Sequence, residues 1–243
     1  MKNFNVKKLD TNQKSLRRRI LELSHKSRLS HLGSCLTAID LIDAVYAVKK
    51  KEEKFVLSNG HAGIALYVVL EKHGYLKNLH KKKHLSVHPD RDIKKGIHVS
   101  TGSLGQGLPI ALGMALADRK KNVYCMISDG ECEEGSIWEA LKVAWKHKVT
   151  NLKIILNANG WAAYEKMDLQ YLKKRIQATG YNVVSLKGHN PKNIVKHLSK
   201  VSSKQTLFFA DTHVGQFSFL SDQDAHYYIM NQNDYEEAMQ QLI

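Results

Sequence analysis

Hydrophobic residues follow two different spacings along this chain, and the two spacings alternate with each other. In residues 15–25 the apolar side chains Leu16, Ile20 and Leu23 fall on one stripe, which is the spacing of an amphipathic helix. Elsewhere short runs are almost wholly apolar, as in residues 122–128, which is typical of a strand buried on both faces. The alternation predicts helices and buried strands in turn.

The same patterns predict an order of elements over most of the chain. Helices are expected at residues 15–25, from an N-cap at Thr37 through Val45, around 65–69, after Gly107, at 135–148 and 166–178, and after Asn190-Pro191. Strands are expected at residues 55–58, 122–128, 152–156, 181–186 and 206–210. The polar, histidine-rich residues 78–102 are predicted to form a functional loop. This order predicts an α/β fold: a doubly wound, mainly parallel sheet with helices on both faces.

Composition adds a prediction about domain organisation. The 243 residues are 43% hydrophobic and 25% charged, within the ordinary range of globular proteins. Only three prolines occur, and no Gly/Ser-rich or repeated tract interrupts the chain. A single domain over residues 1–243 is therefore expected.

The charge of the chain is strongly positive, with a formal net charge of +14. The basic residues form scattered clusters without interleaved aromatic residues, which favours a solvated surface over a nucleic-acid site. Three cysteines without a Cys-x-x-Cys pair argue against a disulfide framework and a zinc site. Without a signal peptide or a long apolar run, we expect a cytoplasmic protein that binds neither nucleic acid nor membrane.

Candidate chemistry lies where two of the predicted strands end. Asp129 and Gly130 follow one apolar strand, and Asn159 follows the next, one strand–helix–strand crossover later. Right-handed crossovers bring such ends side by side, and ligands bind beyond the carboxyl ends of parallel strands. A carboxylate and an amide oxygen suit Mg²⁺, and Gly130 lets backbone approach a phosphate closely. The alternatives are a helix N-cap or turn acid at Asp129 and a turn residue at Asn159.

These strand ends belong to a series of longer blocks along the chain. They are Ser30-His31-Leu32-Gly33, Phe55-Val56-Leu57-Ser58-Asn59-Gly60-His61-Ala62, His88-Pro89, Ser100-Thr101-Gly102-Ser103-Leu104-Gly105-Gln106-Gly107, Ser128-Asp129-Gly130-Glu131, Glu134-Gly135-Ser136-Ile137-Trp138-Glu139-Ala140 and Asn157-Ala158-Asn159-Gly160. The blocks resemble those of the N-terminal, thiamine diphosphate-binding subunits of transketolases made of two polypeptides. They occur in the family's order, and the resemblance covers nearly the whole chain from about Ser15.

The resemblance implies thiamine diphosphate and Mg²⁺ (or Ca²⁺) as cofactors. It assigns the metal to Asp129, Asn159 and the carbonyl oxygen of Trp161. The residues that it assigns to the cofactor are His61, Gly102, Ser103, Leu104, Gly130, Glu131, Asn159 and His226.

The resemblance also implies catalytic residues and a reaction, the transfer of a two-carbon ketol unit from a ketose to an aldehyde. His31, His88 and His226 would face the sugar hydroxyls and move protons. Glu134 would lie across a subunit interface, towards a glutamate of the partner. The implied partner is a C-terminal, pyrimidine-binding transketolase subunit in an α₂β₂ assembly, because no second α/β unit is predicted here.

Some residues depart from the family pattern, and two other functions stay open. Ser128 stands in place of a glycine, Leu32 in place of a proline, and Asn157 in place of a common aspartate. Ser128 would either crowd the diphosphate or donate a hydroxyl to it. The alternatives are a component of another thiamine diphosphate enzyme, which decarboxylates a ketoacid or makes an unusual sugar, and a non-catalytic basic binding protein.

Overall fold

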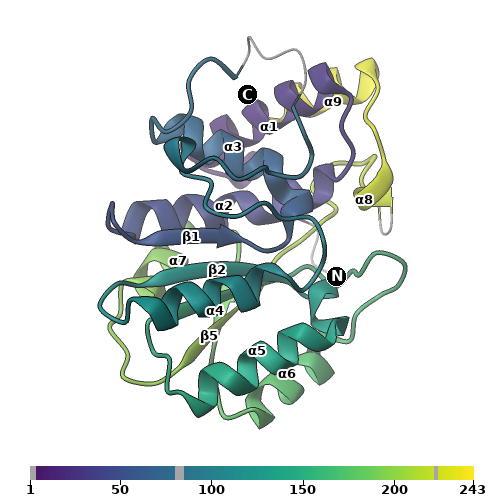
Figure 1. Cartoon of the computed structure of the whole chain (residues 1–243). Helices are drawn as coiled ribbons and strands as arrows, with labels where there is room; N and C mark the ends of the chain where they lie inside the picture. The colour runs from purple at the N-terminus through teal and green to yellow at the C-terminus, as the bar shows by residue number, and fades with distance from the viewer. Residues whose placement is uncertain (1–3, 80–84, 222–223) are drawn as a thin grey trace.

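The computed structural model of the chain describes residues 4–79, 85–221 and 224–243. Its centre is a sheet of parallel strands with helices packed on it (Figure 1). The strand order is β1-β2-β3-β5-β4. The strands are β1 (Lys54–Leu57), β2 (Val123–Ser128), β3 (Leu152–Ala158), β4 (Asn182–Lys187) and β5 (Thr206–Asp211). The predicted parallel α/β sheet is confirmed, and each predicted strand is present with its ends shifted by a few residues.

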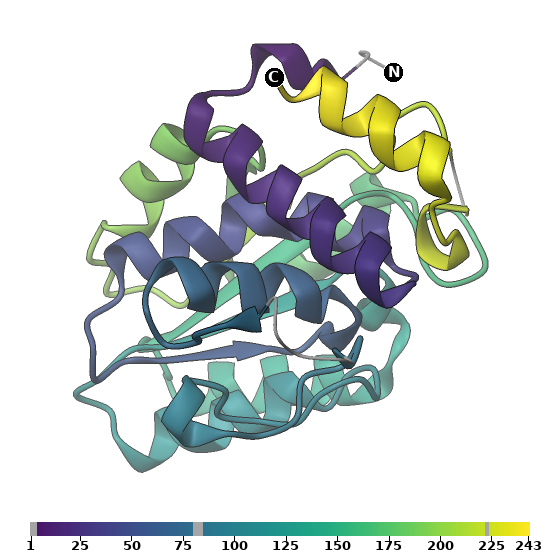
Figure 2. The ribbon, with the colours of Figure 1, turned by 90° about the horizontal axis from the view of Figure 1, so that it is seen from above.

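Helices cover both faces of this sheet (Figures 1 and 2). On one face lie α1 (Thr11–Ser27), α2 (Leu32–Val48), α3 (Gly63–Lys72), α7 (Pro191–Leu198) and α9 (Gln232–Gln241). On the other face lie α4 (Gly107–Ala117), α5 (Gly135–Lys146) and α6 (Leu169–Ala178). Alternate residues of β2 serve the two cores, with Tyr124 and Met126 in the first and Cys125 and Ile127 in the second. Strands β2 and β3 are thus buried along their whole length on both faces, which is why they lack a polar alternation, whereas the edge strand β4 is largely exposed or half-buried.

Helix α2 begins earlier than the sequence predicted. Its N-cap is His31, whose backbone is left-handed with φ of 63°, and Thr37 lies inside the helix. The N-cap prediction for Thr37 was wrong because its hydroxyl donates to the carbonyl of Ser34, 2.9 Å away, within the same helix. The same hydroxyl accepts a hydrogen bond of 3.0 Å from Nδ2 of Asn157. Thr37 therefore ties α2 to strand β3.

A buried ion pair fixes α1 against α2. Nη2 of Arg17 lies 2.6 Å from Oδ2 of Asp40, and both side chains are almost completely buried. Nδ1 of His189 lies 2.9 Å from the same oxygen. Because Nε2 of His189 accepts the backbone N–H of His213, the ring proton is on Nδ1 and is donated to Asp40. This network joins the two helices to the loops that follow β4 and β5.

The remaining differences from the predicted elements lie at element ends and in the C-terminal part. The helix expected from residue 166 begins at Leu169, after an N-cap at Asp168. Helices α8 (Asp224–Tyr227) and α9 were not predicted. Of the expected loop at 78–102, residues 80–84 lie outside the described residues, and residues 85–102 are irregular except for a short turn at Ile93–Lys95. Within the described parts of the chain, every helix is too short or too polar to cross a membrane.

Candidate active site

A small cavity of about 160 Å³ lies at the carboxyl ends of the strands, where the parallel sheet predicts a ligand site. Its walls come from loops and helix starts that are far apart in the sequence. The lining residues are His31, His61, His88, Gly102, Leu104, Ser128, Gly130, Asn159, Trp161, Ala162, Ala163, His226 and Tyr227.

Asp129 directly follows β2, between the lining residues Ser128 and Gly130, and is fully buried. Its Oδ2 accepts the N–H of Gly160 at 2.6 Å, and its Oδ1 accepts the N–H of Gly130 at 3.1 Å. Burial raises the pKa of this carboxyl to about 7, against the opposing effect of nearby backbone N–H groups, among them those of Gly160 and Gly130. Each oxygen keeps a second lone pair, so the carboxylate can also bind a cation, which would favour its charged form. The turn role foreseen as an alternative for Asp129 is therefore present beside its capacity to bind metal.

Asn159 and Trp161 lie on the loop that follows β3 and face Gly130. Oδ1 of Asn159 accepts the backbone N–H of Trp161 at 2.9 Å, so this side chain also serves a turn. A Cβ atom on Gly130 would lie 3.1 Å from Cα of Ala162 and 3.8 Å from the carbonyl oxygen of Trp161. Glycine thus allows the two strand-end loops to approach each other closely. The three residues that the sequence assigned to the metal are brought together at one edge of the sheet.

Glu131 occupies a different position from the other predicted cofactor residues. Its carboxylate is buried, and Oε1 accepts the hydroxyl of Ser58 at 2.7 Å and the N–H of Gly105 at 2.9 Å. Oε2 accepts the N–H of Ser128 at 3.1 Å. Burial raises the pKa of this carboxyl, while the donors lower it. Glu131 therefore links three segments near the cavity by hydrogen bonds, but it does not line the cavity itself.

Four histidines converge on the cavity from four segments of the chain. The ring centroid of His31 lies 5.5 Å from that of His61, 6.3 Å from that of His88 and 6.2 Å from that of His226. Burial is the main cause that lowers the pKa of His31 to about 4 and that of His61 to about 3, and the neighbouring histidines lower both further. Burial also lowers the pKa of His226. His31, His61 and His226 are therefore neutral near pH 7, when each ring has one donor and one acceptor nitrogen.

The backbone of His31 links the start of α2 to the C-terminal part of the chain. Its N–H donates to the carbonyl of His226 at 2.7 Å. The Nδ1 atoms of both histidines are buried and have no hydrogen-bond partner among the described residues. Buried nitrogens of this kind are rare in folded proteins and point to a ligand or water.

The other predicted residues lie near the cavity but differ in exposure. Gly102 and Leu104 line it, and a Cβ on Gly102 would lie 2.8 Å from the ring of His88. Ser103 is exposed and does not belong to the lining. Glu134 is exposed at the N-cap of α5, outside the cavity.

Sequence reasoning missed three lining residues, Ala162, Ala163 and Tyr227. The two alanines follow Asn159 closely, and Tyr227 follows His226, so proximity to predicted residues was the available signal. The side-chain direction of Tyr227 depends on the short helix α8, which no pattern indicated.

The described residues fit a diphosphate ester with a divalent cation. One carboxylate, one amide oxygen and one carbonyl oxygen are hard ligands of the kind that Mg²⁺ binds. No group of three or more His, Cys, Asp or Glu residues in the described parts of the chain is arranged to hold a metal, so a site of transition-metal type is not indicated. Gly102 and Gly130 lack a Cβ, which lets His88 and Ala162 approach the backbone closely beside the cavity. The unpaired nitrogens of His31 and His226 offer polar contacts.

The fold and the site define the chain as an α/β protein with a ligand cavity at the carboxyl edge of a parallel sheet. The family profile described as "Transketolase, thiamine diphosphate binding domain" matches residues 26–242. The chain therefore belongs to the transketolase family and corresponds to its thiamine diphosphate-binding domain.

Two relatives and one solved structure illustrate the similarity. One of the subunits of apulose-4-phosphate transketolase from Phocaeicola vulgatus is 28% identical, over 98% of this chain and 94% of that protein. A 6-deoxy-6-sulfo-D-fructose transketolase subunit from a Clostridium species is 32% identical, over 85% of each chain. The crystal structure of transketolase from Campylobacter jejuni superposes with a TM-score of 0.78 and 25% identity, over 96% of this chain and 42% of that one. The chain thus spans most of the two subunits and less than half of the longer transketolase.

Proposed function

We propose that this chain is the diphosphate- and Mg²⁺-binding subunit of a transketolase that moves a two-carbon ketol unit from a ketose to an aldehyde. The observation that carries the proposal is the convergence of Asp129, Asn159 and the Trp161 loop beside a cavity lined by four histidines. The family match and the relatives named as transketolase subunits support it.

The metal in this proposal is Mg²⁺, held by Asp129, Asn159 and the carbonyl oxygen of Trp161. The two backbone N–H groups on the Asp129 carboxylate orient it before a cation arrives, so little entropy is lost on binding. Gly130 and the neighbouring Ser128 lie at the cavity wall, where backbone and hydroxyl groups reach the diphosphate. Oγ of Ser128 accepts the N–H of Glu131 at 3.3 Å, which leaves its own proton to donate to a phosphate oxygen. Of the two effects foreseen for Ser128, we therefore favour hydrogen-bond donation over crowding.

Thiamine diphosphate would supply the carbanion chemistry by which the carbon–carbon bond of a ketose is cleaved. The chain's own contribution is to bind, orient and exchange protons. Neutral His31 and His226 are able both to donate to and to accept from sugar hydroxyls, and to move a proton at the reacting carbonyl oxygen. The loops held by Glu131 give the cavity a fixed shape, because three of its walls share one carboxylate.

The partner in this proposal is a pyrimidine-binding C-terminal subunit, and helix α4 is its contact surface. α4 has no charged residue, yet Ile110, Gly113 and Ala117 are exposed on it. A helix that is apolar on all sides is normally buried, so its exposed face indicates a surface that another protein covers. α4 directly follows the loop with Gly102 and Leu104, so a partner seated on it also reaches the cavity. Glu134 is exposed close to the same loop and is available to that partner.

Titration calorimetry of Mg²⁺ and thiamine diphosphate into the purified chain, alone and with the product of the neighbouring gene, tests the proposal. We expect Mg²⁺-dependent binding, and loss of affinity by about 100-fold or more in Asp129→Asn, because a charged metal ligand is removed. Asp168→Asn is the matched control. Asp168 also accepts two backbone N–H groups, at 3.0 and 2.9 Å, but caps α6 away from the cavity. Equal losses in the two variants, or binding that ignores Mg²⁺, would contradict the proposed site.

A further inference from the structure

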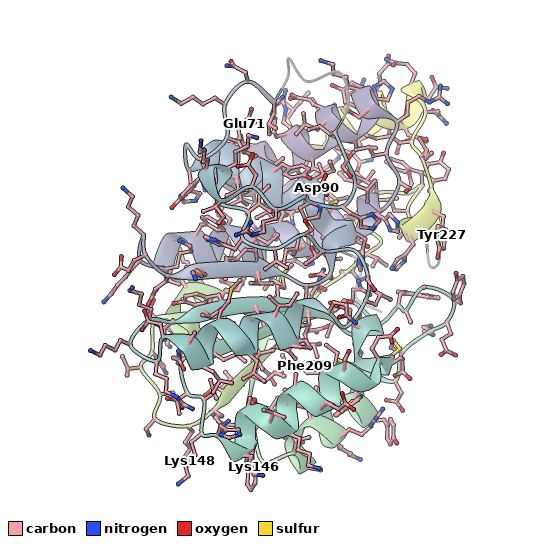
Figure 3. All side chains as sticks on the ribbon, in the orientation of Figure 1. Glu71, Asp90, Lys146, Lys148, Phe209 and Tyr227 are labelled. Carbon is pink, nitrogen blue, oxygen red and sulfur yellow. The ribbon has the colours of Figure 1, made fainter. Side chains whose placement is uncertain are left out.

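Two tyrosines from different segments meet at the mouth of the cavity. Tyr227 belongs to α8 and is 50% exposed, and Tyr164 belongs to the loop between β3 and α6 and is 81% exposed. Their ring centroids are 6.5 Å apart with an angle of 24° between the ring planes. α8 lies beside this loop in both ribbon views (Figures 1 and 2), and Tyr227 projects from α8 at the edge of the molecule (Figure 3).

Tyr227 is also a wall of the cavity on the side of the histidines. Its ring centroid lies 6.0 Å from that of His31 and 6.2 Å from that of His226. Among the described lining residues there is no lysine or arginine, so this end of the cavity is bounded by neutral rings. A ligand that hydrogen-bonds to the two histidines therefore lies beside the ring of Tyr227.

The contact with Tyr164 positions the Tyr227 ring. Burial raises the pKa of the Tyr227 hydroxyl, and so does its hydrogen bond with Tyr164. Aromatic pairs at this separation attract each other beyond the area they bury, which is enough to bias the orientation of an exposed side chain. The pair thus keeps the ring over the cavity and does not leave it free in solvent.

The volume of the cavity limits the size of the ligand that it can hold. The cavity measures about 160 Å³, and pockets for drug-sized ligands usually measure about 300–1,000 Å³. The walls made by β2, β3 and the Glu131 loops are buried and hydrogen-bonded, whereas Tyr227 and Tyr164 are exposed. The tyrosine pair is therefore the wall whose removal enlarges the cavity at least cost to the fold.

We propose that Tyr227, positioned by Tyr164, is a specificity-determining residue that limits the length of the sugar able to reach His31 and His226. The inference rests on the proposed function for the identity of the ligand. The ligand class is a short open-chain sugar, whose C–H groups pack against the ring while its hydroxyls meet the histidines. Longer chains collide with the ring.

The first test needs no catalysis. Diethyl pyrocarbonate modifies neutral imidazoles, and mass spectrometry of the metal- and cofactor-free chain measures the rate at His31 and His226 separately. Tyr227→Ala should raise both rates at least fivefold, while Tyr227→Phe should leave them unchanged. Tyr171→Ala is the matched control, because Tyr171 is 60% exposed on α6 and does not line the cavity. Unchanged rates in Tyr227→Ala would overturn the proposal.

The second test uses the complex reconstituted with its partner, Mg²⁺ and thiamine diphosphate, and a series of aldehyde acceptors of increasing chain length. In Tyr227→Ala the ratio of the KM of the longest acceptor to the KM of the shortest should fall about tenfold, with kcat little changed. A tenfold change is the size of discrimination that steric fit usually gives. Tyr164→Ala should give a smaller shift in the same direction. A chain-length profile identical to that of the unaltered protein would overturn the proposal.

The two tests separate failure of this inference from failure of the proposed function. If the complex binds no thiamine diphosphate and transfers no ketol unit, the proposed function is wrong. The modification rates then decide by themselves whether Tyr227 limits access to the histidines. If ketol transfer occurs but the rates and the chain-length profile do not respond to Tyr227→Ala, only the inference about Tyr227 is wrong.

Discussion

His31, His61 and His226 differ from ordinary histidines because burial lowers their pKa values. A folded-state pKa of about 4 at His31 means that the folded chain excludes a proton that the unfolded chain binds below its ordinary pKa of 6.5. The free energy of unfolding therefore falls as the pH falls from 6.5 to about 4, and no further loss from this residue occurs below that range. Asp129, whose pKa is raised, contributes a trend of the opposite sign between its ordinary pKa and about 7. The net slope is the sum of these two contributions and those of the other groups with shifted pKa values, such as His61.

His31→Asn isolates the contribution of the histidine. Asparagine tolerates the left-handed backbone that His31 adopts, so the start of α2 is preserved. We expect the stability advantage of the unaltered chain over the variant to shrink by about 1–2 kcal/mol between pH 6.5 and 4, after allowance for solvent screening. Urea unfolding over this pH range measures it, and Asp129 cancels because it is present in both chains. Parallel stability curves would show that burial of His31 does not shift its pKa.

At the scale of elements, much of the fold was predictable because the two hydrophobic spacings differ so clearly. The strands β1 to β5 are predicted by short apolar runs, and most helices are predicted by the helical spacing of apolar residues. Both patterns can be read from the local sequence alone. The start of α2 was not predictable in this way. It depends on His31 in a left-handed conformation that glycine or asparagine usually adopts, and on Thr37 hydrogen-bonded inside the helix and not at its end.

Helix α2 also offers a matched pair of acids that differ in burial. Asp40 and Arg17 have side chains exposed by 1% and 0%, whereas Asp43 and Lys72 have side chains exposed by 13% and 38%. Asp40→Asn leaves the Arg17 charge buried without a countercharge and should lower the free energy of unfolding by about 3–5 kcal/mol. Asp43→Asn, on the same helix, should cost under about 1 kcal/mol. Thermal and urea unfolding of both variants measure the difference. Similar losses would mean that the buried pair contributes no more to the free energy of unfolding than the exposed pair.

At the scale of the whole molecule, the only site residues that could be predicted from the order of elements are those that directly follow a strand. Asp129 and Asn159 follow from the order of strands and crossovers, because parallel strands place their carboxyl ends together. The role of Glu131 was not predictable, since its partners Ser58 and Gly105 come from loops that the sequence does not show to be adjacent. Tyr164 and Tyr227 meet for the same reason, through tertiary packing alone.

The exposed apolar face of α4 leads to a prediction about assembly. Ile110→Glu places a charge on this face without disturbing the core, because Ile110 is 40% exposed. The variant should keep its thermal stability and weaken association with the partner subunit at least tenfold, since a buried charge without a countercharge is costly. Light scattering after gel filtration of the mixed subunits measures the association. Val201→Glu, at a fully exposed position after α7, is the control, and equal effects of both changes would exclude α4 as the contact surface.

The hydrogen bond from the N–H of His31 to the carbonyl of His226 has a consequence for the order in which the protein matures on the ribosome. The sheet is complete once β5 has emerged, because its strands pair with neighbours that were synthesised earlier. The cavity still lacks the segment with His226 at that moment, so a nascent chain has a compact sheet before it has a site. Contacts that close so late in the chain are slow to form, because their partners are far apart in sequence. Premature termination within the last few dozen residues would therefore leave a folded but ligand-incompetent product.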